Sequence, residues 1–129
     1  MSKRKLTTEQ NEKREEELMK ALINFPKEIA DKGHNRIIQL INDRARSNQT
    51  RFEHIIKYGH KLRPSDFITI IQKIGHSRLK KDDKKKLTWN YYIKRGDDSP
   101  EFIKISVLEN KTDKRYVKIL TIFITKNVK

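Results

Sequence analysis

The change of hydrophobic period near residue 87 is the feature that most constrains the fold. Before it, apolar residues recur at helical spacing, most clearly at Phe67, Ile70, Ile71 and Ile74. After it, apolar and polar residues alternate, as expected for strands with one buried face. Helices that precede strands in the chain predict an α+β fold. We expect N-terminal helices packed on a small C-terminal antiparallel sheet.

Four helices are expected in the first part of the chain. They cover residues 9–24, residues 35–46, the segment from Thr50 to Gly59 and the segment from Ser65 to Gly75. Two of them begin with a capping-box pattern, in which two side chains satisfy free backbone N–H groups of the first turn. The pairs are Thr7 with Gln10, and Thr50 with Glu53. Ser65 is the expected N-cap of the last helix, and Gly75 its end.

Three strands are expected after a lysine-rich loop at residues 77–86. They cover residues 87–94, 101–109 and 115–126, and short polar turns join them into an antiparallel meander. In the last strand, Tyr116, Leu120, Ile122 and Ile124 are expected to share a face. Residues 1–49 are therefore expected to form an N-terminal helical segment, and residues 50–129 an α+β core in the same compact domain.

The charge of the chain indicates a polyanionic partner. Its 129 residues include 31 Lys or Arg and 17 Asp or Glu, which gives a net charge of +14. Eleven of the fourteen excess positive charges lie from Arg51 onward. This distribution favours nucleic acid first, and an acidic protein or an anionic membrane surface second.

Several classes of protein are excluded by what the sequence lacks. There is no cysteine, which excludes disulfides, thiolate zinc sites and cysteine nucleophiles. No apolar run approaches the roughly 20 residues that a membrane span needs, and no signal peptide is visible. We therefore expect a cytoplasmic protein that does not associate with membranes.

Two histidines in a basic segment are the main candidates for chemistry. His54 and His60 are six residues apart, and Arg51, Lys57 and Arg63 surround them. Such a set suits cleavage of RNA, because one group can accept the 2′-OH proton, another can protonate the leaving oxygen, and cations can stabilise the phosphate. Two surface histidines without a catalytic role are the alternative that the spacing leaves open.

No metal or other cofactor is expected. Asp97, Asp98 and Glu101 lie close together, but they fall in a predicted turn, where solvated acidic residues are ordinary. The order Glu-Phe-Ile-Lys that ends at Lys104 also differs from the Glu-x-Lys pattern of restriction-type metal nucleases.

Side chains on the predicted strands are candidates for RNA binding. Tyr92 is expected on the face opposite Trp89 and Tyr91, where an exposed ring can stack on a base. Lys94, Arg95 and Arg115 supply cations near the strand ends. Thr121 and Thr125 have two interpretations: they are hydroxyls directed at a phosphate, or they are ordinary β-branched strand residues.

The order of these features resembles the phage and polymorphic-toxin branch of the barnase–EndoU–colicin–RelE (BECR) nucleases. The resemblance covers residues 50–126. It rests on Arg-Phe-Glu-His-Ile followed by Gly59-His60, and on the strands TWNYYIKR, EFIKISVLEN and KRYVKILTIFITK with its Thr-Ile-Phe-Ile-Thr ending. The family combines N-terminal helices with a small antiparallel sheet, and its members are metal-independent RNases that are frequently toxins.

The resemblance implies roles for individual residues. His54 or His60 would provide the acid–base pair, Lys104 with nearby arginines would clamp the phosphate, and Thr121 or Thr125 would contact it through a hydroxyl. The expected catalytic residues are His54, His60, Lys104 and Thr121. The expected substrate-binding residues are Arg51, Lys57, Arg63, Tyr92, Lys94, Arg95, Arg115 and Thr125.

The sequence therefore predicts a metal-independent endoribonuclease, a toxin or phage effector, that cleaves RNA by attack of the 2′-OH. A cognate acidic immunity or antitoxin protein is the expected protein partner. The alternative is a non-catalytic nucleic-acid-binding protein or an inhibitor of a host nuclease, of phage or mobile-element origin. A weaker alternative is a protein-interaction domain that docks through residues 9–24.

Overall fold

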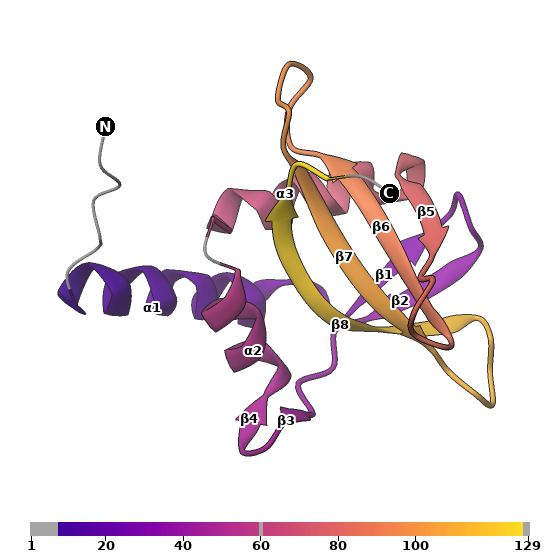
Figure 1. Cartoon of the computed structure of the whole chain (residues 1–129), viewed down its shortest axis with the longest axis horizontal. Coiled ribbons are helices and arrows are strands. Elements are labelled where there is room, and N and C mark those ends of the chain that lie inside the picture. The colour runs from indigo at the N-terminus through magenta and orange to yellow at the C-terminus, as the bar shows by residue number, and fades with distance from the viewer. Residues whose placement is uncertain (1–7, 60, 128–129) are drawn as a thin grey trace.

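The chain adopts an α+β fold with an N-terminal helix and a curled six-stranded sheet (Figure 1). The computed structural model describes residues 8–59 and 61–127. The helices are α1 (Thr8–Asn24), α2 (Arg51–Tyr58), α3 (Pro64–Lys73) and the 3₁₀ turn η1 (Ile74–His76). The strands are β1 (Glu28–Asp31), β2 (Arg36–Gln39), β3 (Arg44–Arg46), β4 (Gln49–Thr50), β5 (Arg78–Lys81), β6 (Thr88–Lys94), β7 (Phe102–Glu109) and β8 (Tyr116–Thr125).

The large sheet is mixed rather than wholly antiparallel. Its strand order is β1-β2-β8-β7-β6-β5, and β3 pairs with β4 in a separate two-stranded ribbon. The predicted meander is present as β6-β7-β8, with antiparallel pairing throughout. The prediction of a purely antiparallel sheet is wrong, because β2 pairs in parallel with β8, Val117 lying opposite Ile38.

Two segments differ from their predicted secondary structure. Residues 35–46 were expected to form a helix, but β2 and β3 occupy most of this range. Asn35 has a φ of 54° in the turn between β1 and β2, which ends any helical path there. The lysine-rich segment 77–86 is not only a loop, since β5 forms in it and pairs with β6.

Capping fixes the starts of the two middle helices. At α2 the predicted capping box is confirmed: the Thr50 hydroxyl accepts from the Glu53 N–H at 3.3 Å, and the Glu53 carboxylate accepts from the Thr50 N–H at 3.4 Å. Helix α3 begins at Pro64 with Arg63 as N-cap, two residues before the predicted Ser65. Proline suits the first helical position, where no N–H partner is needed. The expected Thr7–Gln10 box includes Thr7, which lies outside the described residues.

One face of β6, β7 and β8 belongs to the hydrophobic core. The buried cluster joins alternate residues of these strands to apolar residues of α1, α2 and α3. A β-bulge interrupts β8, because Ser106 pairs with Thr121 whereas Val107 pairs with Ile119. The predicted face Tyr116, Leu120, Ile122 and Ile124 is therefore wrong. Val117 and Ile119 are buried before the bulge and Ile122 after it.

The sheet curls until the β1–β2 turn reaches η1 (Figure 1). Gly33 lies so close to η1 that an added Cβ would be 2.1 Å from the Gly75 carbonyl oxygen. The His34 ring contacts the Ser77 carbonyl at 3.4 Å beside it. The first hairpin therefore packs against the segment that leads into β5, at the other edge of the sheet. None of the described helices is long and apolar enough to cross a bilayer.

Candidate nucleic-acid interface

The second face of the sheet, opposite the core, carries polar and cationic side chains in two rows. In one row Asn90, Ser106 and Thr121 are direct neighbours across β6, β7 and β8. In the other row Tyr92, Lys104 and Phe123 are neighbours in the same way. Strand β5 extends the rows with Lys80 opposite Asn90 and Arg78 opposite Tyr92. We call this surface the open face.

Asn90 organises the open face through both ends of its amide. Its side-chain oxygen accepts from the Ser106 hydroxyl at 2.7 Å, and its NH₂ group donates to Asp82 at 3.1 Å. The other Asp82 oxygen accepts the backbone N–H groups of Lys84 and Lys85, both at 2.9 Å. These hydrogen bonds hold the pKa of Asp82 below its ordinary value, and the hydrogen bond from Asn90 has the largest effect. The turn between β5 and β6 is thereby tied to the sheet.

Lys104 carries a charge that no carboxylate in the described chain pairs by direct contact. Its Nζ lies 5.7 Å from the centre of the Tyr92 ring and 5.4 Å from the centre of the Phe123 ring. Rings at these distances attract a cation without neutralising its charge. The predicted residues Lys104, Tyr92 and Thr121 are thus brought together on one face. Tyr92 was expected to be exposed, which is wrong, since it is 5% exposed.

His54 has a half-buried ring on α2. It packs against Tyr58, one turn further along the helix, with 4.7 Å between ring centroids. Its Nδ1 is buried and has no hydrogen-bond partner among the described residues. Burial lowers the pKa of His54, and the positive charges of Arg46, Arg51 and Lys85 lower it further. The ring is consequently neutral at pH 7 and can accept a proton.

Arg51 and its neighbours attach α2 to β8. The Arg51 guanidinium contacts Asp43 at 2.5 Å and donates to the Leu120 carbonyl at 3.4 Å. Asp43 also pairs with Lys118 on β8 at 2.7 Å. Arg51 was predicted to bind substrate, but its charge is neutralised inside the protein. Its role here is to hold the start of α2, and with it His54, beside β8.

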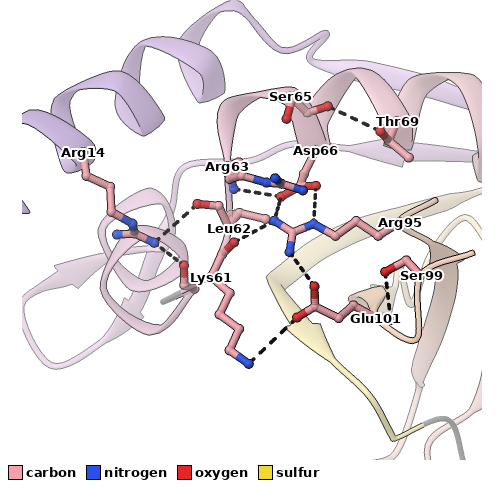
Figure 2. A network of polar contacts seen from close by, with 11 residues as sticks. Arg14, Lys61, Leu62, Arg63, Ser65, Asp66, Thr69, Arg95, Ser99 and Glu101 are labelled. Atoms are coloured by element: carbon pink, nitrogen blue, oxygen red, sulfur yellow. Dashed lines mark hydrogen bonds and ion pairs between the residues drawn. The ribbon is translucent and has the colours of Figure 1, made fainter. Parts of the chain in front are cut away.

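Arg95 also has internal partners (Figure 2). It donates to both carboxylate oxygens of Asp66, at 2.9 and 2.8 Å, and to Glu101 at 3.1 Å. It also donates to the Lys61 carbonyl at 2.8 Å. The Arg95 and Asp66 side chains are 8% and 2% exposed. This predicted substrate-binding residue therefore joins the start of α3 to the β6–β7 turn.

Two of three further predicted binding residues, Lys57 and Arg63, lie at helices outside the open face. Lys57 is exposed on α2, with its Nζ 5.7 Å from the Tyr58 ring centre. Arg63 is exposed at the N-cap of α3. The third, Lys94, is exposed at the end of β6 and lies on the open face, since it follows Asn90 and Tyr92 by strand alternation and is opposite Phe102.

Of the remaining predicted residues, Thr125 lies on the open face, two residues after Phe123 on β8, and Arg115 lies in the turn before this strand. Arg115 is 74% exposed and pairs with Asp113 at 2.8 Å in the turn before β8. The Thr125 hydroxyl accepts from the backbone N–H of Asn127 at 3.0 Å. His60 lies outside the described residues. His54 forms no hydrogen bond or ring contact with Lys104 or Thr121 in the part of the chain that the structure describes.

Asn90, Ser106, Asp82 and Lys80 are open-face residues that were not among the predicted site residues. Asn90 has a visible sequence signal, because asparagine is depleted in strand interiors and here occupies the middle of TWNYYIK. Ser106 likewise interrupts an apolar strand. Their partners become evident only with the strand register.

The described residues contain no group of three or more His, Asp or Glu side chains that could hold a metal ion. Comparison with protein-family models, with curated proteins and with solved structures finds no match to this chain.

Proposed function

We propose that the protein is a metal-independent endoribonuclease that holds RNA against the open face. One observation carries this proposal: β8 both holds the helix of the half-buried His54, through Arg51, and contributes Thr121 to the open face, where Lys104 forms no ion pair within the described chain. RNA supplies its own nucleophile, the 2′-OH, so that positioned acid–base groups and cations suffice for cleavage.

In the proposed reaction, His54 accepts the proton of the 2′-OH. The 2′-oxygen then forms a bond to phosphorus while the bond from phosphorus to the 5′-oxygen breaks. Lys104 stabilises the charge that builds up on the phosphate, and Thr121 donates a hydrogen bond to it. His60 is the proposed donor of the proton to the leaving 5′-oxygen. The products are a 2′,3′-cyclic phosphate and a 5′-OH end.

The family resemblance supplies the finer part of the proposal. The order of α2, α3 and the β6-β7-β8 meander supports a BECR-like arrangement, with helices packed on one face of the sheet. A toxin or phage effector of this kind would act on RNA in a cytoplasm and would be controlled by an acidic immunity or antitoxin protein. The net charge of +14 is consistent with binding to both of these polyanionic partners, RNA and an acidic protein.

The test is incubation of the purified protein with RNA in EDTA. Wild type should cleave, and His54→Ala and Lys104→Ala should each lose cleavage by about 10²-fold or more. His34→Ala removes an exposed histidine of the β1–β2 turn, which contacts Tyr91 on the core side of the sheet, and is the matched control, which should cleave normally. Intact RNA with the wild type, or equal cleavage by His54→Ala, would refute the proposal.

A non-catalytic nucleic-acid-binding protein is the second candidate. It is favoured by one observation: within the described chain no second acid–base group forms a hydrogen bond or ion pair with His54. On this alternative, RNA binds to the open face and is recovered intact. Binding that depends on Lys104 while the RNA remains uncleaved would select this candidate over the nuclease.

A further inference from the structure

A recess of about 230 Å³ lies at the β5 side of the open face, beneath the β5–β6 turn. Strands β5, β6 and β7 and the turn contribute its walls. The lining residues are Lys80, Lys81, Asp82, Asp83, Lys84, Asn90, Tyr92 and Lys104. The recess is large enough for a small anionic group, and Lys104 links it to the proposed cleavage face.

The residues that line the recess have a net charge of +2. Four lysine ammonium groups line it against two carboxylates, and none of the four forms an ion pair in the described part of the chain. The Asp82 carboxylate accepts from Asn90 and from two backbone N–H groups of the turn. Asp82 thus holds the lysine-bearing turn in place.

Tyr92 adds an unused polar group. Its side chain is 5% exposed and lines the recess, yet its hydroxyl makes no hydrogen bond within the described residues. A hydroxyl that is free to bind, beside four ammonium groups without ion pairs in the described chain, favours a ligand with hydrogen-bonding oxygens and negative charge.

We propose that this recess binds the terminal phosphate of an RNA strand. The inference rests on the proposed function, and it narrows the substrate class to RNA that ends in a phosphate monoester. A monoester carries a charge of about −1.5 to −2 at pH 7 and has three acceptor oxygens, whereas an internal diester carries a single charge. The excess of two positive charges therefore fits a strand end better than the middle of a strand.

The experiment measures binding without cleavage. A short 2′-O-methylated RNA cannot be cleaved by 2′-OH attack, so its affinity is measurable whether or not the protein is a nuclease. The same oligonucleotide is prepared with a 5′-phosphate, with a 3′-phosphate or with hydroxyl groups at both ends, and binding is followed by fluorescence anisotropy. One of the two phosphorylated forms should bind at least about tenfold more tightly than the hydroxyl form.

Matched variants locate the effect. Lys80→Ala/Lys84→Ala removes two exposed charges from the recess, and Lys111→Ala/Lys114→Ala removes two exposed charges from the β7–β8 turn. The first variant should lose the preference for the phosphorylated RNA, and the second should keep it. The preference should also weaken between about pH 7 and pH 5, because the second ionisation of a phosphate monoester has a pKa near 6.

Three results would overturn the inference. The first is equal affinity for phosphorylated and hydroxyl-ended RNA. The second is an unchanged preference for phosphorylated RNA in Lys80→Ala/Lys84→Ala. The third is displacement of the bound RNA by adenosine monophosphate at the same concentrations at which phosphorylated RNA displaces it. The last result would make the recess a site for free nucleotides. Because the ligand is uncleavable, failure of RNA cleavage in EDTA refutes the nuclease separately from this site.

Discussion

Asp66→Asn tests whether Arg95 has a structural role. The substitution keeps the size of the side chain and removes its charge. Both carboxylate oxygens are needed at residue 66: Oδ1 accepts from Arg95 Nε, and Oδ2 accepts from Arg95 Nη2 and from the Arg63 N–H at 2.8 Å. An asparagine has one oxygen and one NH₂ group, so that one donor would face another.

The expected cost follows from the burial of the pair. Arg95 is 8% exposed and would keep only Glu101, itself 24% exposed, as a charged partner. Removing one member of a buried ion pair costs about 3–5 kcal/mol. Since Glu101 remains, we expect the lower end of that range, about 3 kcal/mol. At about 4 °C per kcal/mol for a chain of this length, the melting temperature should fall by about 12 °C.

Urea unfolding followed by the fluorescence of Trp89, the only tryptophan, measures the change. Asp113→Asn is the matched control, because Asp113 forms an ion pair with Arg115, whose side chain is 74% exposed. Exposed pairs contribute less than about 1 kcal/mol. The two identical substitutions should therefore differ by about 2 kcal/mol or more in the free energy of unfolding.

Two outcomes would refute the reasoning. The first is a loss in Asp66→Asn no larger than that in Asp113→Asn. The second comes from Arg95→Met: weaker RNA binding with unchanged stability would show that Arg95 acts on the ligand, as the sequence predicted. A double variant, Asp66→Asn with Arg95→Met, should be less destabilised than the sum of the single variants, because no buried charge remains unpaired.

Gly33→Ala should destabilise the protein by about 2 kcal/mol, because its Cβ would lie 2.1 Å from the Gly75 carbonyl oxygen. Gly75→Ala, where no atom lies within 4 Å of the added carbon, should cost far less in the same urea assay, and equal costs would contradict the packing. The acid limb of the cleavage profile should lie below pH 6.5, because the pKa of His54 is lowered from that value; a midpoint at or above 6.5 would exclude this histidine as the base. Burial raises the pKa of Asp43, but its hydrogen bonds to Arg51 and Lys118 outweigh burial and lower it. The stabilisation of the fold by the Asp43 carboxylate is therefore complete above about pH 4 and is lost as the pH falls through the lowered pKa. The loss of unfolding free energy in Asp43→Asn should accordingly shrink on acidification. A loss that stays constant with pH would contradict this prediction.

The features that were predictable from sequence are those contained in a few consecutive residues. The capping box of α2 needs only Thr50 and Glu53, and the strands of the meander need only alternation. Strand β2 was not predictable in this way, because its partner in β8 is some 80 residues further along the chain. A run such as Arg36–Gln39 fits a short helix as well as a strand until that partner is known.

The residues of the candidate site differ in the same way: some positions could be predicted from local sequence and others required the fold. Lys104 and Thr121 follow from strand alternation and do lie on the open face. Arg51 and Arg95 look like other basic residues in the sequence, and only the fold shows that Asp43 and Asp66 neutralise them. Charge counts therefore indicate a class of ligand to test, but they do not distinguish a cation that is free to bind from one that is already paired.

The place of β8 in the sheet has a consequence for how the chain matures during translation. β8 is the last strand in the described sequence, yet it lies between β2 and β7. A nascent chain that has emerged only as far as β7 lacks the strand that joins its early hairpin to the rest of the sheet. It also lacks Thr121, and with it one end of the row that begins at Asn90. Most of this chain therefore emerges from the ribosome before the open face is complete. A chain truncated ahead of β8 would keep Lys80, Lys84 and Lys104 but not the complete surface that arranges them.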